Sequence, residues 1–244
     1  HRDLHSFPTR RSSDLSGTGV LTDFSGITRG ANPKMGALEI NNYVWQGNTS
    51  TDFGTASNWS GNMVPPDGAD IEFDVNPARS CVLDQNRTLG NISNAQSTDK
   101  LVVNGKQLTI NGDLIFTNGA QIDATATLSS VIFAGTSIQS IPLNSFFNNT
   151  IYTLSVDNSL GLTLNGDLTL VQALNLVNGS FEIGSHTLTI NGDLLVNSGT
   201  LQGGSTSNII FGGAGSSTNL PGITLNNLTI NRGSGILLSG DVNV

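Results

Sequence analysis

The chain has little charge, one cysteine and few of the residues that favour helices. Of its 244 residues only 11% are charged, and glutamate and lysine number three each. The single cysteine, Cys81, excludes an internal disulfide framework and a zinc site built on cysteines. Few helix formers beside 29 glycines argue against a helical bundle and against a doubly wound α/β enzyme. No apolar run approaches the roughly 20 residues that a membrane-spanning helix needs.

The composition that remains favours a folded, acidic, all-β protein. Apolar residues make up 36% of the chain, which is enough for a core, and the net charge is −8. A negative chain without a basic patch disfavours binding to nucleic acid or to an anionic membrane surface. We therefore expect no nucleic-acid partner and no membrane insertion, and the composition suits an extracellular or cell-surface bacterial protein.

The first fifteen residues, 1–15, read HRDLHSFPTRRSSDL. This string resembles an in-frame translation of a common sequencing adapter. We therefore expect residues 1–15 to be a disordered artefact, outside the fold. His1 and His5 then leave any catalytic argument, and the signal peptide and true N-terminus are expected to be missing from this fragment of a longer reading frame.

The next segment, residues 16–42, carries a turn motif and a strand motif. The pattern D-x-x-G-x-x-R falls on Asp23–Arg29, and G-A-x-E falls on Gly36–Glu39. Together they resemble the closing segment of pectate-lyase-like right-handed β-helix domains in bacterial surface proteins. The resemblance implies the tail of a larger upstream β-helix, and the alternative is an ordinary loop and strand.

Residues 43–79 form a distinct unit that contains both tryptophans. Its pattern W-x-G…STDF-x-TASNWS-G resembles a module-start motif in very large secreted proteins of gliding Gram-negative bacteria, which usually leave the cell by type IX secretion. We expect this unit to cap the repeats on its C-terminal side, because an open solenoid end exposes apolar core and strand edges. The alternative is a carbohydrate-binding site, since aromatic rings beside amide side chains can stack on sugars; its candidate residues are Tyr43, Trp45, Phe53 and Trp59.

From about residue 80 the chain repeats itself. The string LT(I/L)NGDL begins at Leu108, Leu162 and Leu188, and a decayed copy, LLSGDV, begins at Leu237. Longer blocks recur 74–80 residues apart, as SSVIFAG at 129–135 does with SNIIFGG at 207–213. Such self-similarity indicates a solenoid, a propeller or an array. We expect each long repeat to make about three coils of ~20–26 residues.

The local pattern selects a solenoid among these architectures. Apolar and polar residues alternate in Leu188–Ile190, as in a half-buried strand, and the Asn-Gly step after it is expected to supply the positive φ of a tight turn. We therefore predict an all-β fold: a parallel β-solenoid (right-handed β-helix) over 80–244, truncated at its C-terminus, with a Trp-rich N-terminal cap. Residues 100–244 also resemble repeat blocks of the same large surface proteins, which implies architecture and not activity.

The repeated motif predicts a structural ladder of turn residues. We expect each aspartate to cap the backbone of its own turn, with occasional Ca²⁺ binding and catalysis left open as alternatives. The calcium repeat G-G-x-G-x-D is absent, so no cofactor is expected. The ladder residues are Asn111, Asp113, Asn165, Asp167, Asn191, Asp193 and Asp241.

No catalytic constellation emerges from the sequence. His186 is the one histidine beyond the first fifteen residues, and it lies in a turn beside a serine. We expect a non-catalytic structural or adhesive segment of a large secreted protein that acts as a rigid stalk. The alternatives are a carbohydrate-binding module of a polysaccharide-processing protein, with a polysaccharide or cell-surface glycan as partner, or part of a polysaccharide lyase or hydrolase.

Overall fold

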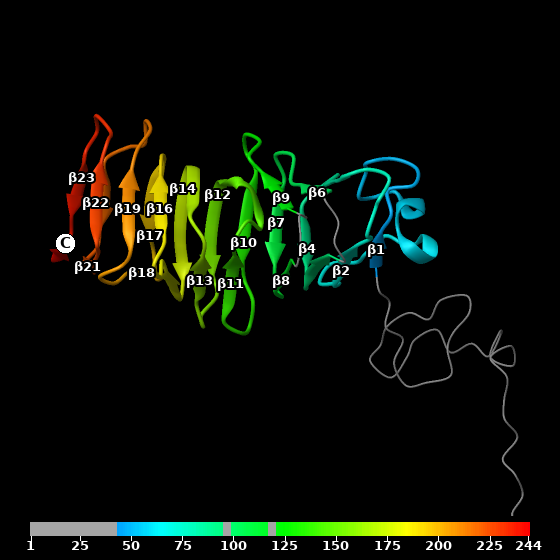
Figure 1. The fold of residues 1–244 in the computed structure, drawn as a ribbon, viewed down its shortest axis with the longest axis horizontal. Helices are drawn as coiled ribbons and strands as arrows, with labels where there is room; N and C mark the ends of the chain where they lie inside the picture. Colours follow the sequence, from blue (N-terminus) through cyan, green and yellow to red (C-terminus); the bar gives the residue numbers. More distant parts are fainter. Residues whose placement is uncertain (1–42, 95–98, 117–120) are drawn as a thin grey trace, which may run out of the picture. The chain divides into compact units, whose positions relative to one another are not determined.

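Short parallel strands, three to a coil, wind around a shared apolar core (Figure 1). The computed structural model describes residues 43–94, 99–116 and 121–244. The adapter-like string and the β-helix tail expected within residues 1–42 lie outside the described residues. The described chain is an all-β solenoid of about eight turns, which confirms the predicted parallel β-solenoid.

Every coil has three faces, which we call X, Y and Z in the order in which the chain visits them. Face X contains β3 (Cys81–Val82), β6 (Lys100–Val102), β9 (Gln121–Ala124), the first halves of β12 (Phe146–Asp157) and β14 (Leu168–Asn178), β16 (Thr187–Ile190), β19 (Asn208–Phe211) and β22 (Asn227–Ile230). Face Y contains β4 (Arg87–Leu89), β7 (Gln107–Ile110), β10 (Ser130–Phe133), the second halves of β12 and β14, β17 (Asp193–Val196), β20 (Thr218–Leu220) and β23 (Ile236–Leu238).

Face Z completes each coil and also extends beyond the first one, toward the N-terminal end. It contains β1 (Tyr43–Trp45), β2 (Ile71–Phe73), β5 (Ile92–Asn94), β8 (Leu114–Ile115), β11 (Gln139–Pro142), β13 (Leu162–Asn165), β15 (Ser180–Glu182), β18 (Thr200–Gln202), β21 (Ile223–Thr224) and β24 (Val242–Asn243). Two 3-10 turns, η2 (Ala56–Asn58) and η3 (Ser60–Asn62), lie between β1 and β2.

We number the coils from β3, so that coil 1 is β3–β5, coil 2 is β6–β8 and coil 3 is β9–β11. Coil 4 is β12–β13 and coil 5 is β14–β15, because β12 and β14 each turn the corner from face X to face Y. Coils 6, 7 and 8 are β16–β18, β19–β21 and β22–β24. Leu168 pairs with Leu188, and Leu188 with Ile209, which gives 20 and 21 residues per coil and about seven per face.

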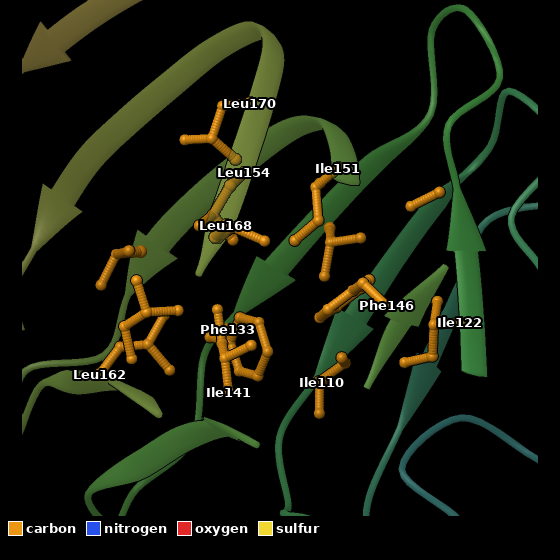
Figure 2. Packing of buried hydrophobic residues seen from close by; sticks show 14 of the residues in the cluster. Ile110, Ile122, Phe133, Ile141, Phe146, Ile151, Leu154, Leu162, Leu168 and Leu170 are labelled. Atoms are coloured by element: carbon orange, nitrogen blue, oxygen red, sulfur yellow. The ribbon is translucent and has the colours of Figure 1, made fainter. Parts of the chain in front are cut away.

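The inward side chains form apolar columns that run along the solenoid (Figure 2). On face Y one column consists of Leu108, Val131, Leu154, Leu174 and Leu194, in register from coil 2 to coil 6. Each is at most 3% exposed, because alternate residues of a strand point to opposite faces of the sheet. Burial of each such side chain is worth roughly 1.5–3 kcal/mol, so the columns are the main source of stability.

The long sequence repeat does not correspond to three coils, as the sequence had led us to expect. The block at 129–135 includes β10 of face Y in coil 3, whereas its copy at 207–213 includes β19 of face X in coil 7. The offset therefore covers eleven faces, one short of four coils. Each long repeat begins one face earlier than the last, because the repeated unit is a face and not a coil.

The Asn-Gly step of the motif plays a different part from the one predicted. Neither residue of the step has a positive φ in any of the three copies. The glycine is required by close packing: a Cβ at Gly192 would overlap the carbonyl of Gln172 in the coil below, and one at Gly112 would overlap Gly90 and Asn91. The corner can therefore approach its neighbour only without a side chain.

Two of the three faces are interrupted between coil 6 and coil 7. Face X stays paired through β16, β19 and β22, but within the described ranges no ladder joins β17 to β20 or β18 to β21. The Thr218 hydroxyl stands in for the ladder: it accepts from the Leu194 N–H at 3.2 Å and donates to the Leu194 carbonyl at 2.5 Å. Pro221, at the next corner, has no N–H to donate. Grooves of about 650 Å³ on face Y and 420 Å³ on face Z open at this junction.

The columns predict a sharp contrast between neighbouring residues of one strand. Ile190→Ala removes a fully buried side chain from β16 and should lower the free energy of unfolding by about 2–5 kcal/mol. Thr189→Ala, one residue away and pointing outward, should change it by less than about 0.5 kcal/mol. Chemical denaturation followed by circular dichroism measures both. Equal effects would contradict the assigned register.

Candidate functional site

Three of the four aromatic residues named in the alternative of sugar binding, Trp45, Phe53 and Trp59, form a plug at the N-terminal end of the solenoid. Trp45 and Trp59 meet edge to face with ring centroids 5.0 Å apart, and Phe53 meets Trp59 at 4.8 Å. The Trp59 indole N–H donates to the Phe53 carbonyl at 2.7 Å, and the Trp45 indole N–H donates to the Arg79 carbonyl at the same distance. Both polar atoms of the indoles are thus satisfied inside the core.

A short loop holds this aromatic plug against coil 1. The Phe53 N–H donates to the Val82 carbonyl at 2.9 Å, and Asp52 forms a parallel bridge with Val82, so the loop covers the free edge of β3. The fully buried Asn58 organises the loop, because its side-chain oxygen accepts from the N–H groups of Thr49 and Ser50, each at 2.9 Å. The segment therefore caps the solenoid, as the sequence predicted.

The burial of these rings bears directly on the carbohydrate-binding hypothesis. Trp45, Phe53 and Trp59 are at most 1% exposed and present no ring face to solvent. Tyr43, in β1, is the one member of the set that is half-buried. Stacking on a sugar needs an exposed ring face, so the predicted site is reduced to a single residue.

Two of the four turn aspartates, Asp167 and Asp193, join neighbouring coils through their carboxylates. Asp167 accepts the N–H of Thr187 at 2.8 Å, and Asp193 accepts the N–H of Ser216 at 2.7 Å. In both pairs the donor lies one coil further along the chain. The Asp113 N–H is held in a similar way, by the Asn91 side chain at 2.8 Å. These bonds correct the expected role of the motif and make its polar residues bridges between coils.

The motif residues also occupy three corners and do not form one ladder. Residues 111–113 lie between faces Y and Z, 165–167 between Z and X, and 191–193 between X and Y. Asp241 lies at a Y–Z corner in coil 8 and is exposed, as are Asn111 and Asn165, whereas Asn191 is half-exposed. The carboxylates therefore do not converge on one another.

A buried glutamine, Gln139, satisfies the carbonyl groups of one motif corner. Its amide nitrogen donates to the carbonyls of Ile110 at 3.0 Å and Gly112 at 2.5 Å. Its oxygen accepts from the buried Asn158 side chain at 3.0 Å and from a backbone N–H at 2.8 Å. Every hydrogen-bonding atom of the amide is thus used in joining coils 2, 3 and 4.

Arg232 makes the same contacts at a second motif corner, and it spans more of the solenoid. Its guanidinium donates to the carbonyls of Ile190 at 2.5 Å and Gly192 at 2.8 Å, the counterparts of Ile110 and Gly112. It also donates to Gly212 at 3.1 Å and Ser216 at 3.2 Å. One side chain from coil 8 therefore binds coils 6 and 7, on either side of the interrupted junction.

The environment of Arg232 is apolar on one side and acidic on another. The guanidinium lies 5.2 Å from the ring centre of Phe211. Burial lowers the pKa of Arg232 from its ordinary value, and the nearby Asp193 carboxylate opposes this shift. Since an arginine remains protonated at neutral pH, the buried group is a cation held by four carbonyl oxygens.

Sequence reasoning missed Gln139, Asn158 and Arg232. The repeat alignment held a signal for the last two, because 153–170 matches 227–244 and places Asn158 against Arg232. A polar residue that recurs just after an apolar strand indicates a polar side chain that turns into the core, as those of Asn158 and Arg232 do. Its partners, 40 and 42 residues away for Arg232, lie beyond any local pattern.

The other titratable groups are scattered. His186 is half-exposed at a corner between faces Z and X, and Cys81 is buried in the core, where burial raises the pKa of its thiol. In the part of the chain that the structure describes, no three or more metal-ligating side chains gather into a group. No helix among the described residues is long and apolar enough to cross a membrane.

Comparison of the chain with family models, with curated proteins and with solved structures finds no match.

The geometry of the cap predicts that its aromatic side chains raise the free energy of unfolding. Trp59→Ala should lower the free energy of unfolding by about 3–5 kcal/mol, because it empties the centre of the plug. Tyr43→Ala, at the half-buried ring, should cost less than half as much. Denaturation followed by far-ultraviolet circular dichroism compares the two. A Trp59 variant with an unchanged midpoint would show that the cap does not contribute.

The Arg232 contacts predict a local loss of stability. Arg232→Met leaves four carbonyls without their donor and should weaken coils 7 and 8 by roughly 1–3 kcal/mol. Hydrogen exchange should then quicken in β19–β24 more than in β12–β15. The exchange rates of Arg232→Lys should lie between those of Arg232→Met and those of the parent chain. Lys106→Met, at a half-exposed site, is the control and should leave the exchange rates unchanged. Uniform quickening along the whole chain would contradict the assigned role.

Proposed function

We propose that this chain is a non-catalytic, rigid β-solenoid segment of a large secreted or cell-surface bacterial protein, in which it acts as a stalk. The observation that carries the proposal is the continuity of face X, which stays paired through every coil from β3 to β22. A stack in which each coil is bonded to the next resists bending and transmits force along its length. Its mechanism is therefore its length and stiffness.

Two further observations support a structural role. The motif carboxylates are spread over three corners, and those of Asp167 and Asp193 are used in bonds between coils. Residues 100–244 also resemble repeat blocks of the large surface proteins that leave gliding bacteria by type IX secretion. This resemblance supports an extracellular location and an adhesin-like parent protein.

The carbohydrate-binding alternative draws less support from the same residues. Its aromatic cluster is the plug of the cap, and only Tyr43 retains exposed surface. A role within a polysaccharide lyase or hydrolase would require acidic and basic side chains brought together. The motif aspartates instead lie at different corners or, for Asp113 and Asp241, at one kind of corner six coils apart. The ion pairs of the described residues, Arg87–Asp84 and Lys100–Asp123, each join one acid to one base.

Stiffness can be measured with spin labels on the full chain. Labels at Gln85→Cys in coil 1 and Ser198→Cys in coil 6, both exposed sites, should give one narrow distance distribution by pulsed electron resonance. Cys81 should stay unlabelled in the folded chain, because it is buried and its thiol pKa is raised. A broad distribution from a folded chain would contradict the stalk.

A further inference from the structure

The junction between coils 6 and 7 is the one place among the described coils where two faces open together. On face Y the groove lies over β17 and β20, and on face Z it lies over β18 and β21. Both grooves include residues of the corner that joins the two faces, Pro221 on face Y and Gly222 on face Z. They form a wedge that follows the path of the strands around the solenoid, which we call the junction wedge.

Among the described residues of the junction wedge, the open backbone groups on the side that faces β20 belong to Val196, at the end of β17. The Leu194 N–H points toward β20, where it meets the Thr218 hydroxyl, and the Asn197 N–H points back to Leu176 in coil 5. Because strand residues alternate, the N–H and C=O of Val196 point toward β20 as well. No hydrogen bond within the described ranges satisfies them on that side. A free strand edge of this kind is a template for a further strand.

The floor of the junction wedge is apolar. Val196 stands in the inward column directly after Leu176, yet it is 40% exposed where Leu176 is fully buried. Its neighbour Leu195 points outward and is 50% exposed. The wedge thus uncovers a core side chain beside the free edge, which gives a bound strand an apolar contact for alternate side chains.

The charge of the wedge selects among possible partners. Glu182 and Asp241 line the groove on face Z, Asp193 lines the groove on face Y, and no lysine or arginine lines either groove. Of these three groove carboxylates, Asp193 acts electrostatically on Arg232, whereas Glu182 and Asp241 take part in neither of the ion pairs found among the described residues. No aromatic ring lines either groove, so a sugar would find no stacking surface.

We propose that the junction wedge binds an extended polypeptide segment by strand addition: apolar side chains contact Val196, the backbone pairs with Val196 at the end of β17, and lysine or arginine reaches Glu182 and Asp241. The segment would run along face Y and continue around the corner onto face Z. Backbone pairing supplies the affinity, and the apolar floor and the carboxylates supply the selection. This site goes beyond the stalk, because it gives the rod a docking point near one end.

A synthetic peptide tests the proposal on the full chain. The probe is acetyl-TVTVGKTK-amide, titrated by calorimetry at low salt and followed by NMR of the labelled protein. We expect saturable binding with shifts confined to β17–β21 and β24. The same peptide with both valines N-methylated cannot pair its backbone and should bind at least about tenfold more weakly. A peptide in which both lysines are replaced by glutamate should also bind about tenfold more weakly, because its charge then matches that of the carboxylates.

Matched variants locate the site. Ser217→Trp fills the groove on face Y from an exposed position and should weaken binding at least about tenfold. Ser159→Trp, at an exposed corner of coil 4 where the ladders continue, should leave it unchanged. Circular dichroism confirms that both variants fold.

Three results would overturn the proposal. The first is a probe that does not bind, and the second is equal binding of the N-methylated peptide. The third is binding of cellohexaose, xylohexaose or chitohexaose that Ser217→Trp abolishes, which would assign the wedge to a neutral glycan. None of these outcomes changes the spin-label distances, so failure here is distinct from failure of the stalk.

Discussion

Each strand of this solenoid obtains its backbone hydrogen bonds from the coil before it and the coil after it. Strands of two to four residues have no stability alone, and their N–H and C=O groups must be paired wherever they are buried. The constraint keeps a face near seven residues where coils are closely matched, and coils 2 to 4 take up extra residues in loops and register shifts so that the later pairs still form. It also fixes the corners, where a glycine such as Gly192 lets one coil approach the carbonyl groups of the next.

Because the constraint acts on each face alike, one heptapeptide can serve at any corner. The same LT(I/L)NGDL string ends a strand of face Y, of face Z and of face X, and in each place it supplies an apolar pair and a close-packed glycine. In the copies on faces Z and X its aspartate also bridges to the next coil. The carbonyl groups left free at such a corner need a donor from elsewhere. Gln139 provides it at one corner and Arg232 at another, so an amide and a guanidinium solve the same geometric problem.

The difference between local patterns and contacts across coils explains which features could be predicted from the sequence. Alternation and repetition are local, so the parallel solenoid and the aromatic cap were predictable. The number of coils in a long repeat was not, because it depends on the length of a coil, and the observed coils of 20 and 21 residues lie at the short end of the expected range. The turn role given to Asn-Gly was wrong, since steric contact between coils and not φ demands the glycine. The bonds of Arg232 cross two coils, and no sequence window of one coil contains both partners.

The interrupted junction arises where the same constraint fails. Here Thr218 places a hydroxyl where a backbone group would pair, Pro221 has no N–H at the next corner, and two faces part while the third holds. Coils 7 and 8 then depend on face X, on the Thr218 hydroxyl and on the guanidinium of Arg232. A rod gains its stiffness by pairing every edge, and it gains a recognition surface only where an edge is left unpaired. In this chain the proposed stalk and the proposed docking site follow from one rule, because each strand edge is either paired with the next coil or left open.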